Sequence, residues 1–496
     1  MLDLIVQGGP IHGHPGADAV GVRCGRIVAV GRAPELGNLR GPKTQVFRLE
    51  GRPLLPGFFD AHVHFLKVGL DRTFFVDLSQ ARTLSEALEL LRARAQERPG
   101  EWVVGRGWDE SRWPEKRYLE RADLDRAVPR QPCCAVRVDG HMMVANTLAL
   151  ARCVRPEGEL VDRARGHLFE DAVFEVLSLV RPSQEALVEA VAAASRYAAS
   201  LGVTAVADMD TEALAFRAYA TAERRGLLRT RIFAYVKADL LPQLVGLGLR
   251  RGFGSPFLRI CGVKAFVDGS IGAKTAALFE PYQGEMGKGR VLLGRGELAR
   301  LWRKVMEAEL QLAVHAIGDR AIEEVLAAAR LAGVGALDRH RVEHLELPTP
   351  HQLDRVKELG LVASMQPNFL QWSGPGRMYE DRLGPTRDAR IDPHRWVLER
   401  GIPLAFGSDG MPLGPLYGIG LALDPPYYPQ RVSWEEALQA YTQGAAFAAF
   451  AEDELGTIAP GKWADFVVLS GDPGRVPQKD LQVDATFVAG ELVFSR

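Results

Sequence analysis

The chain has few cysteines and no apolar run long enough to cross a bilayer. Its 496 residues include five Cys, an odd number without a C-x-x-C spacing. This argues against a disulfide framework or a zinc finger and fits a reducing compartment. No predominantly apolar stretch reaches the length of a membrane span, and the first residues include an acid where a secretory signal would be basic. We therefore expect a cytoplasmic protein that does not enter a membrane.

Net charge and lysine are also scarce. The formal charge is -1 at pH 7 and the pI is about 6.9, so the chain lacks the basic surface that nucleic acids or anionic membranes require. Of its 61 basic residues only 11 are Lys, which makes a Lys inside an apolar strand conspicuous. We expect a small-molecule partner, no nucleic acid and no membrane, and the sequence leaves a homo-oligomer open.

Both ends of the chain predict short β segments separated by Gly, Pro and Asp turns. Four segments lie near the N-terminus, at residues 2–6, 19–22, 26–30 and 45–49, and similar ones follow at residues 465–470 and 485–490. A terminal fragment with so few strands would expose unpaired edges. We therefore expect residues 1–53 and 451–496 to form one composite β-sandwich domain.

Residues 54–450 alternate between apolar β-like runs and segments with helical periodicity. Eight strands alternating with helices predict an α/β fold, a closed (β/α)8 TIM-like barrel, with a doubly wound open sheet as the alternative. The predicted strands are residues 55–65, 203–207, 232–236, 260–267, 312–316, 340–345, 361–365 and 404–406.

The first unit of this predicted barrel is much longer than the others. Roughly 140 residues separate its first strand from the second, against roughly 20 to 50 for each later unit. We therefore expect a large insertion over the active-site face, at residues 66–185.

The first predicted barrel strand carries two histidines on one face. Side chains two residues apart in a strand point the same way, so His62 and His64 are aimed together, beside Asp60. Neutral imidazole nitrogens in this arrangement suit a divalent metal ion. A second H-x-H, formed by His12 and His14, lies in a Gly/Pro-rich turn, and there we predict solvated loop histidines.

Later strands end on further residues that can bind a metal, at the face where barrel enzymes build their active sites. Lys264 lies between apolar neighbours, so burial should lower its pKa. A neutral amine can take up carbon dioxide and become a carbamate, which can bridge two metals. The alternative is that Lys264 pairs with a buried carboxylate such as Asp208 or Asp268. The other strand-end candidates are His315, His344 and Asp409.

With these residues in this order, the sequence resembles the amidohydrolase superfamily. More narrowly it resembles the amidohydrolase family 3 group, which includes N-substituted formamide deformylases. The resemblance covers nearly the whole chain, through P-G-F-F-D-A-H-V-H (56–64), G-R-G-W-D (105–109), V-D-G-H (138–141), V-K-A-F-V-D-G-S (263–270), H-A-I-G-D-R-A (315–321), R-V-E-H (341–344), G-S-D (407–409) and L-G-T-I-A-P-G-K-W-A-D-F-V-V-L (455–469). It implies a metal site formed by His62, His64, His315, His344, Asp409 and a carboxylated Lys264.

This ligand set implies a metal-dependent amidohydrolase that cleaves a non-peptide C–N bond of an amide, N-acyl or N-formyl compound with a metal-activated hydroxide. One or two zinc ions would lower the pKa of a bound water toward neutrality. Asp409 would be the catalytic residue that takes its proton and passes it to the leaving nitrogen. The alternatives are a mononuclear-zinc deaminase of the same superfamily and a non-catalytic metal-binding protein.

We expect substrate contacts from the insertion and from one barrel loop. His141, Trp108 and Trp113 in the insertion, and Asn368 in the loop at residues 366–372, would wall a pocket whose aromatic faces suit an apolar group. For each aromatic residue, packing in the hydrophobic core is the alternative.

Overall fold

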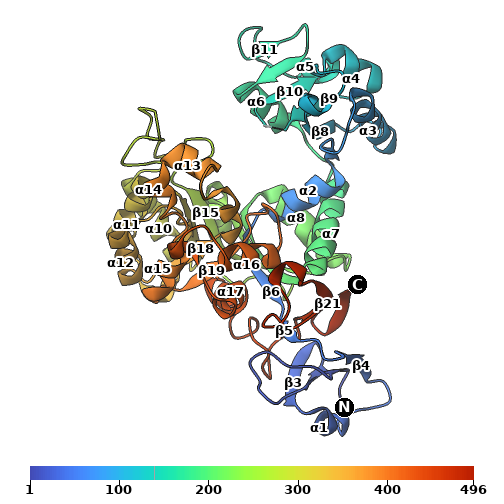
Figure 1. Ribbon diagram of the computed structural model, residues 1–496, viewed down its shortest axis with the longest axis vertical. Coiled ribbons are helices and arrows are strands. Elements are labelled where there is room, and N and C mark those ends of the chain that lie inside the picture. The colour runs from blue at the N-terminus through green and yellow to red at the C-terminus, as the bar shows by residue number, and fades with distance from the viewer. Residues whose placement is uncertain (139) are drawn as a thin grey trace. The chain divides into compact units, whose positions relative to one another are not determined.

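The computed structural model describes residues 1–138 and 140–496 and divides into two compact units (Figure 1). One unit comprises Met1–Phe65 with Ser195–Arg496, and the other comprises Leu66–Ala194. The second unit begins at the predicted start of the insertion and ends at Ala194, beyond the predicted end at residue 185.

Eight parallel strands of the first unit form one sheet in chain order, which confirms the TIM-like barrel. The sheet closes because the amides of Ser408 and Asp409, just after the last strand, both donate to the carbonyl oxygen of His62 in the first, at 3.1 and 2.7 Å. The open-sheet alternative is therefore wrong. The strands are β6 (Phe58–Val63), β13 (Val203–Thr211), β14 (Arg231–Lys237), β15 (Leu258–Phe266), β16 (Gln311–Ala316), β17 (Arg341–His344), β18 (Val362–Met365) and β19 (Leu404–Phe406).

Amphipathic helices connect these strands and cover the outside of the barrel (Figure 1). In α10 (Arg295–Glu307) the buried residues are Leu298, Ala299, Trp302 and Val305, a spacing that places them on one face of the helix. The helix α17 (Trp434–Gln439) begins at a capping box formed by Ser433 and Glu436. Other helices around the barrel are α7 (Gln184–Ser200), α8 (Ala213–Arg224), α11 (Asp319–Ala332), α12 (Pro350–Glu358), α15 (His394–Glu399) and α16 (Pro415–Leu423).

The two ends of the chain build a β-sandwich within the same compact unit, as predicted. One sheet contains β1 (Leu4–Gln7), β2 (Ala19–Arg23), β3 (Arg26–Gly31) and β4 (Gln45–Arg48), and the other contains β5 (Leu54–Pro56), β20 (Phe466–Leu469), β21 (Val483–Val488) and β22 (Glu491–Ser495). The sheets share a hydrophobic core, in which the rings of Phe47 and Phe487 meet edge to face at 5.0 Å.

The first predicted barrel strand proves to be two strands. Residues 54–56 form β5, which pairs with β20 in the sandwich, and the barrel strand β6 begins at Phe58. Gly57 lies between them, where a Cβ atom would come within 2.3 Å of Thr204 Oγ1. The chain therefore passes from the sandwich to the barrel at Gly57, not at the predicted boundary between residues 53 and 54.

The insertion has its own sheet and its own hydrophobic core. Trp108 and Trp113 are 0% and 1% exposed, their rings stack at 5.7 Å, and their indole N–H groups donate to the carbonyls of Ala135 and Ala81. The prediction that these two Trp residues wall a substrate pocket is wrong, because both are core residues. The elements include β7 (Val76–Asp77), β8 (Val103–Trp108), β9 (Cys133–Arg137), β10 (Met142–Ala145), β11 (Val161–Asp162), β12 (His167–Phe169), α3 (Leu84–Glu97), α4 (Arg121–Ala127) and α6 (Asp171–Leu179).

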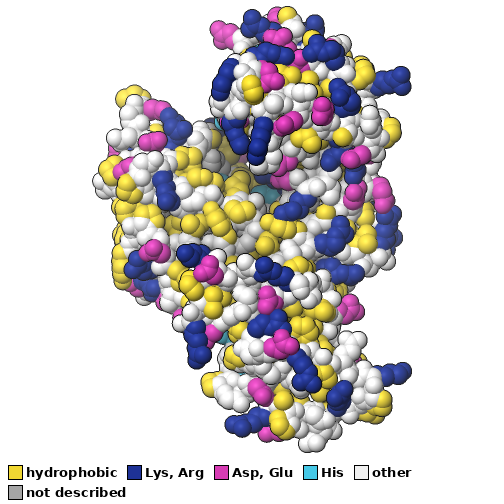
Figure 2. Space-filling view, turned by 45° about the vertical axis from the view of Figure 1, so that its right-hand side comes forward, with side chains coloured by type: hydrophobic (Ala, Val, Ile, Leu, Met, Phe, Trp, Pro, Cys, Tyr) yellow, Lys and Arg dark blue, Asp and Glu magenta, His cyan; other side chains and the backbone are white. Residues whose placement is uncertain are grey.

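The structure also describes the cysteines and the apolar character of the helices. All five Cys side chains are free thiols. Among the described residues no helix combines the length and apolar character needed to cross a bilayer. Basic and acidic side chains are interspersed over the face shown in Figure 2, in keeping with the net charge of -1.

Candidate metal centre

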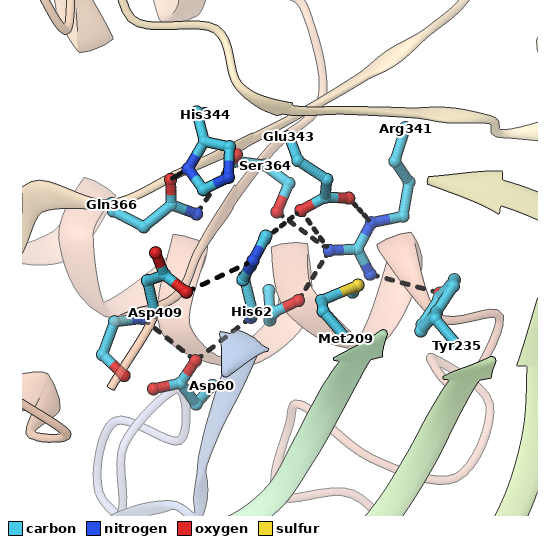
Figure 3. Close-up of polar contacts among 12 residues, drawn as sticks. Asp60, His62, Met209, Tyr235, Arg341, Glu343, His344, Ser364, Gln366 and Asp409 are labelled. Atoms are coloured by element: carbon cyan, nitrogen blue, oxygen red, sulfur yellow. Dashed lines mark hydrogen bonds and ion pairs between the residues drawn. The ribbon is translucent and has the colours of Figure 1, made fainter. Parts of the chain in front are cut away.

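Three side chains converge at the carboxyl end of the first and last barrel strands, and Figure 3 shows two of them, His62 and Asp409. His62 lies in β6, His64 directly follows this strand, and Asp409 follows β19. Asp409 Oδ1 lies 3.6 Å from His62 Nε2 and 3.3 Å from His64 Nε2. One nitrogen or oxygen from each residue lies within 4.8 Å of the others, so the three can hold one metal ion.

Two more histidines extend this cluster along the barrel mouth. The ring centroids of His62 and His344 are 4.7 Å apart, and those of His344 and His315 are 4.5 Å apart. Burial lowers the pKa of His62 and His344 far below the usual value, and that of His315 to about 3. These imidazoles therefore remain neutral, which is the form that binds a metal.

Fixed hydrogen-bond acceptors set the tautomers of three imidazoles. Because each acceptor receives a hydrogen bond from an Nδ1–H group, the proton stays on Nδ1 and the lone pair is left on Nε2. The Nδ1 donors and their acceptors are His62 to Glu343 Oε2 at 2.6 Å, His64 to the carbonyl of Met209 at 3.0 Å, and His344 to Gln366 Oε1 at 2.7 Å.

His315 is held through its other ring nitrogen, Nε2. Its Nε2 donates to the carbonyl oxygen of Gly269 at 3.0 Å and lies 3.5 Å from Asp268 Oδ1. As a metal ligand it would have to use Nδ1. The structure thus brings His315 to the row of histidines, but the compact group of possible ligands among the described residues contains only His62, His64 and Asp409.

The buried polar atoms without a hydrogen-bond partner among the described residues include Asp60 Oδ2, His62 Nε2 and Lys264 Nζ at this site. An unsatisfied buried polar group costs roughly 1–3 kcal/mol. Lys264 is 1% exposed, and burial lowers its pKa to about 8, although the nearby Glu343 and Asp409 act in the opposite direction. The neutral imidazole nitrogen of His62 beside the Asp409 carboxylate fits a divalent cation. Lys264 can bind one only after it loses its proton, and its lowered pKa makes that loss easier.

The alternative that Lys264 pairs with Asp208 or Asp268 does not describe this structure. Asp208 accepts from the amide of Phe65 and the hydroxyl of Thr211. Asp268 accepts from three backbone amides, at 2.9 to 3.1 Å. Both carboxylates are therefore engaged elsewhere, and Lys264 Nζ has none of their oxygens as a hydrogen-bond partner.

A buried ion pair behind the histidines was not predicted. Arg341 and Glu343 of β17 form two hydrogen bonds, at 2.7 and 3.1 Å, and both side chains are fully buried. Arg341 also donates to the carbonyl of Ala61, to Ser364 and to Tyr235 (Figure 3). The signal in the sequence was the presence of two opposite charges in a four-residue buried strand, R-V-E-H.

Three residues near the carboxyl ends of the barrel strands have a left-handed backbone conformation. His344 has φ +72°, Asp409 +55° and Asp210 +61°, values that L-residues rarely adopt. Asp60 Oδ1 accepts from the amides of His62 and Ser408, at 3.1 and 3.0 Å, and so ties the end of β19 to β6. Such strain commonly accompanies functional sites.

The predicted substrate residues have different outcomes. Asn368 is fully buried, donates to the carbonyl of Pro412 and accepts from Tyr441, so its predicted pocket-wall role is wrong. Phe369 of the same loop instead stacks parallel to His344 at 5.8 Å. His141 is exposed beside Glu170 in the second unit and stays a prediction. Asp139 of the V-D-G-H motif lies outside the described residues.

Comparisons with known proteins agree with this geometry. A family described as "Amidohydrolase family" matches residues 45–494. Protein LONG AFTER FAR-RED 3 of Arabidopsis thaliana is 31% identical, covering 100% of this chain and 92% of that protein. N-substituted formamide deformylase of Arthrobacter pascens is 27% identical, covering 97% and 95%. The crystal structure of an uncharacterized metal-dependent hydrolase from Pyrococcus furiosus has a TM-score of 0.85 and 29% identity, covering 95% and 99%.

Proposed function

Because the chain belongs to the amidohydrolase family, we propose that it hydrolyses the non-peptide C–N bond of an amide, N-acyl or N-formyl compound. Membership makes it a metal-dependent hydrolase, and we propose that its divalent ion is held at the barrel mouth. The observation that carries the finer proposal is a pair of buried nitrogens near Asp409, His62 Nε2 and Lys264 Nζ, which have no hydrogen-bond partner among the described residues. The similarity to a formamide deformylase supports the same class of bond.

The proposed reaction converts an amide and water into a carboxylic acid and an amine. A divalent ion held at the barrel mouth, which we propose to be zinc, would lower the pKa of a bound water and polarise the scissile carbonyl. His62 and His64 would hold it through Nε2, with their tautomers fixed by Glu343 and Met209. Asp409 takes the water proton and transfers it to the leaving nitrogen, which departs as a neutral amine.

We propose further that Lys264 carries a carbamate. Its neutral amine would add to the carbon of CO2, and the N–H proton would leave to solvent, giving an anionic oxygen ligand. Burial without a partner and a pKa of about 8 support this chemistry. A carbamate at this position favours the amide hydrolase over the mononuclear deaminase.

Labelling with 13C-bicarbonate tests the carbamate directly. We expect a carbamate carbon signal in the metal-loaded protein and its loss in Lys264→Met, whose unbranched side chain fills similar space. Lys304→Met on α10, at an exposed position, is the matched control and should retain the signal. A wild-type protein without the signal would rule out carboxylation of Lys264.

Metal removal tests the reaction itself. Chelation should abolish the release of amine from a panel of N-formyl and N-acyl amines, and zinc should restore it. The panel should include an aminopyrimidine and an aminopurine, from which a deaminase would release ammonia. Ammonia release without hydrolysis of any N-acyl compound would replace this proposal by the deaminase. A metal-loaded protein inactive on the entire panel would contradict both.

A further inference from the structure

A cavity of about 560 Å³ lies in the first unit among three segments that are far apart in the sequence. The loop between β1 and β2 contributes His12 and His14, α17 and the following π-helical turn at residues 440–444 contribute Glu435 and Gln443, and the loop before β20 contributes Ile458. Its volume is in the range of small-molecule sites, roughly 300–1,000 Å³. None of the predicted metal ligands lines it.

Hydrogen bonds and close packing hold the walls of this cavity in place. The amide of His12 donates to the carbonyl of Leu54 at 2.9 Å, and His14 Nε2 donates to the carbonyl of Ile458 at 2.5 Å. At Gly456, a Cβ atom would lie 2.9 Å from the Cα of Gln443. The prediction that His14 is a solvated loop histidine is wrong, because it is half-buried and hydrogen-bonded. The lining therefore resembles a preformed site more than a mobile loop.

The polar lining is suited to a cation. Among the described lining residues Glu435 is the only Asp, Glu, Lys or Arg. Burial lowers the pKa of His12, although Glu435 acts in the opposite direction, so the imidazole is mainly neutral at neutral pH. Carboxamides of Gln439 and Gln443 supply further acceptors. A carboxylate among neutral acceptors, without a basic residue, favours a positively charged ligand.

The rest of the lining argues for an organic ion rather than a metal. Pro56, Ile458 and Ala459 give the cavity an apolar wall, which a hydrocarbon group can cover. His12, His14 and Glu435 do not form a compact ligand group: the one group of that kind among the described residues is His62, His64 and Asp409. The two histidines and Glu435 instead lie on different walls of the cavity, and the cavity is large enough for a ligand of several non-hydrogen atoms.

We propose that this cavity binds a small organic ammonium ion with an apolar body. The ammonium group donates to the carboxylate of Glu435 and to a neighbouring carboxamide oxygen, and the hydrocarbon packs against Pro56 and Ile458. This site is separate from the metal centre and does not depend on the proposed reaction.

Isothermal titration calorimetry of the full chain with n-hexylammonium tests the proposal, with 1-hexanol and hexanoate as neutral and anionic probes of the same length. We expect the ammonium ion to bind and both other probes to bind at least about tenfold more weakly, because they lack the charge that pairs with the carboxylate. Glu435→Gln should weaken ammonium binding by a similar factor. The exposed Glu435 is not part of the Ser433–Glu436 cap, so this variant should fold normally.

Two further variants locate the bound ion. Glu358→Gln removes an exposed carboxylate from α12 and should leave binding unchanged. His62→Ala alters the metal centre and should also leave it unchanged. The proposal is overturned if Glu435→Gln binds hexylammonium as tightly as the wild type, if hexanoate binds equally well, or if affinity falls in His62→Ala instead. A failure of amide hydrolysis would leave these results unaffected, so the two proposals fail separately.

Discussion

Replacing Asp409 with Asn should lower kcat for amide hydrolysis by about 10²- to 10⁴-fold, the usual contribution of a positioned general base or acid. The amide of Asn occupies nearly the same space as the carboxylate but cannot take a proton from water at neutral pH. The substitution also removes the negative charge of Asp409, whose Oδ1 lies 3.6 Å from His62 Nε2 and 3.3 Å from His64 Nε2. Metal affinity should therefore fall as well, and kcat should be measured at saturating metal.

Asn is the appropriate substitution because of the backbone at this position. Asp409 has φ +55°, and Asn adopts this left-handed region more readily than Ala or other non-glycine residues. The variant should therefore retain the melting temperature of the wild type to within a few degrees in the metal-free state. Ala would combine a catalytic effect with a backbone effect.

The matched control is Asp453→Asn, at an exposed position of the same unit. Its kcat and metal affinity should equal those of the wild type. If Asp409→Asn retains kcat within about tenfold of the wild type, less than the smallest loss expected for a proton-transfer residue, Asp409 does not carry the proton transfer.

The barrel could be predicted because its signals are local. Each strand is an apolar run ending near a turn, and the alternation with helices specifies parallel strands and therefore one end at which side chains gather. His62, Lys264, His315 and Asp409 were identified because each polar residue interrupts or ends such a run. Their convergence follows from the topology alone.

The division of the first strand could not be predicted in this way. Residues 54–56 and 58–63 form one continuous β-like run in the sequence, and periodicity does not reveal that β5 pairs with β20 near the other end of the chain. The contact that separates the two strands is the close approach of Gly57 to Thr204. This contact forms only when distant parts of the chain pack together, and it produces no periodic pattern of residues in the sequence.

Burial explains the errors at the substrate residues. Trp108 and Trp113 were assigned to a pocket because aromatic residues commonly line one, but the insertion has a core of its own that these rings fill. Asn368 was assigned as a polar contact, yet its amide connects two loops within the barrel. A residue type shows what a side chain can do, and only the fold shows whether ligand can reach it.

The partners that orient the histidines were missed for a related reason. Gln366 lies at the end of β18 and reaches His344 on β17, while Glu343 of β17 reaches His62 on β6. The contacts join different strands, and the paired residues are 22 and 281 positions apart in the chain. The spacing of residues within one segment therefore does not predict them. The paired side chains come into contact only in the folded barrel, so the structure is needed to identify them.

Glu343→Gln should weaken metal binding by about 10- to 100-fold, the range found when an orienting partner of a ligating histidine is removed. Gln can still accept from His62 Nδ1, but without a negative charge it raises the basicity of the imidazole less. The same change leaves the guanidinium of Arg341 buried without its counter-ion. Loss of one partner of a buried pair costs about 3–5 kcal/mol, so the free energy of unfolding should fall by this amount.

A surface pair of the same chemistry provides the control. Glu323 accepts from Arg355 at 2.7 and 2.8 Å, but both side chains remain partly exposed. Glu323→Gln should therefore lower the free energy of unfolding by less than about 1 kcal/mol and leave metal affinity unchanged. Urea denaturation of the metal-free chain and competition with a chelator measure the two effects separately. Equal losses in both variants, or unchanged metal affinity in Glu343→Gln, would show that the buried pair does not support the metal centre.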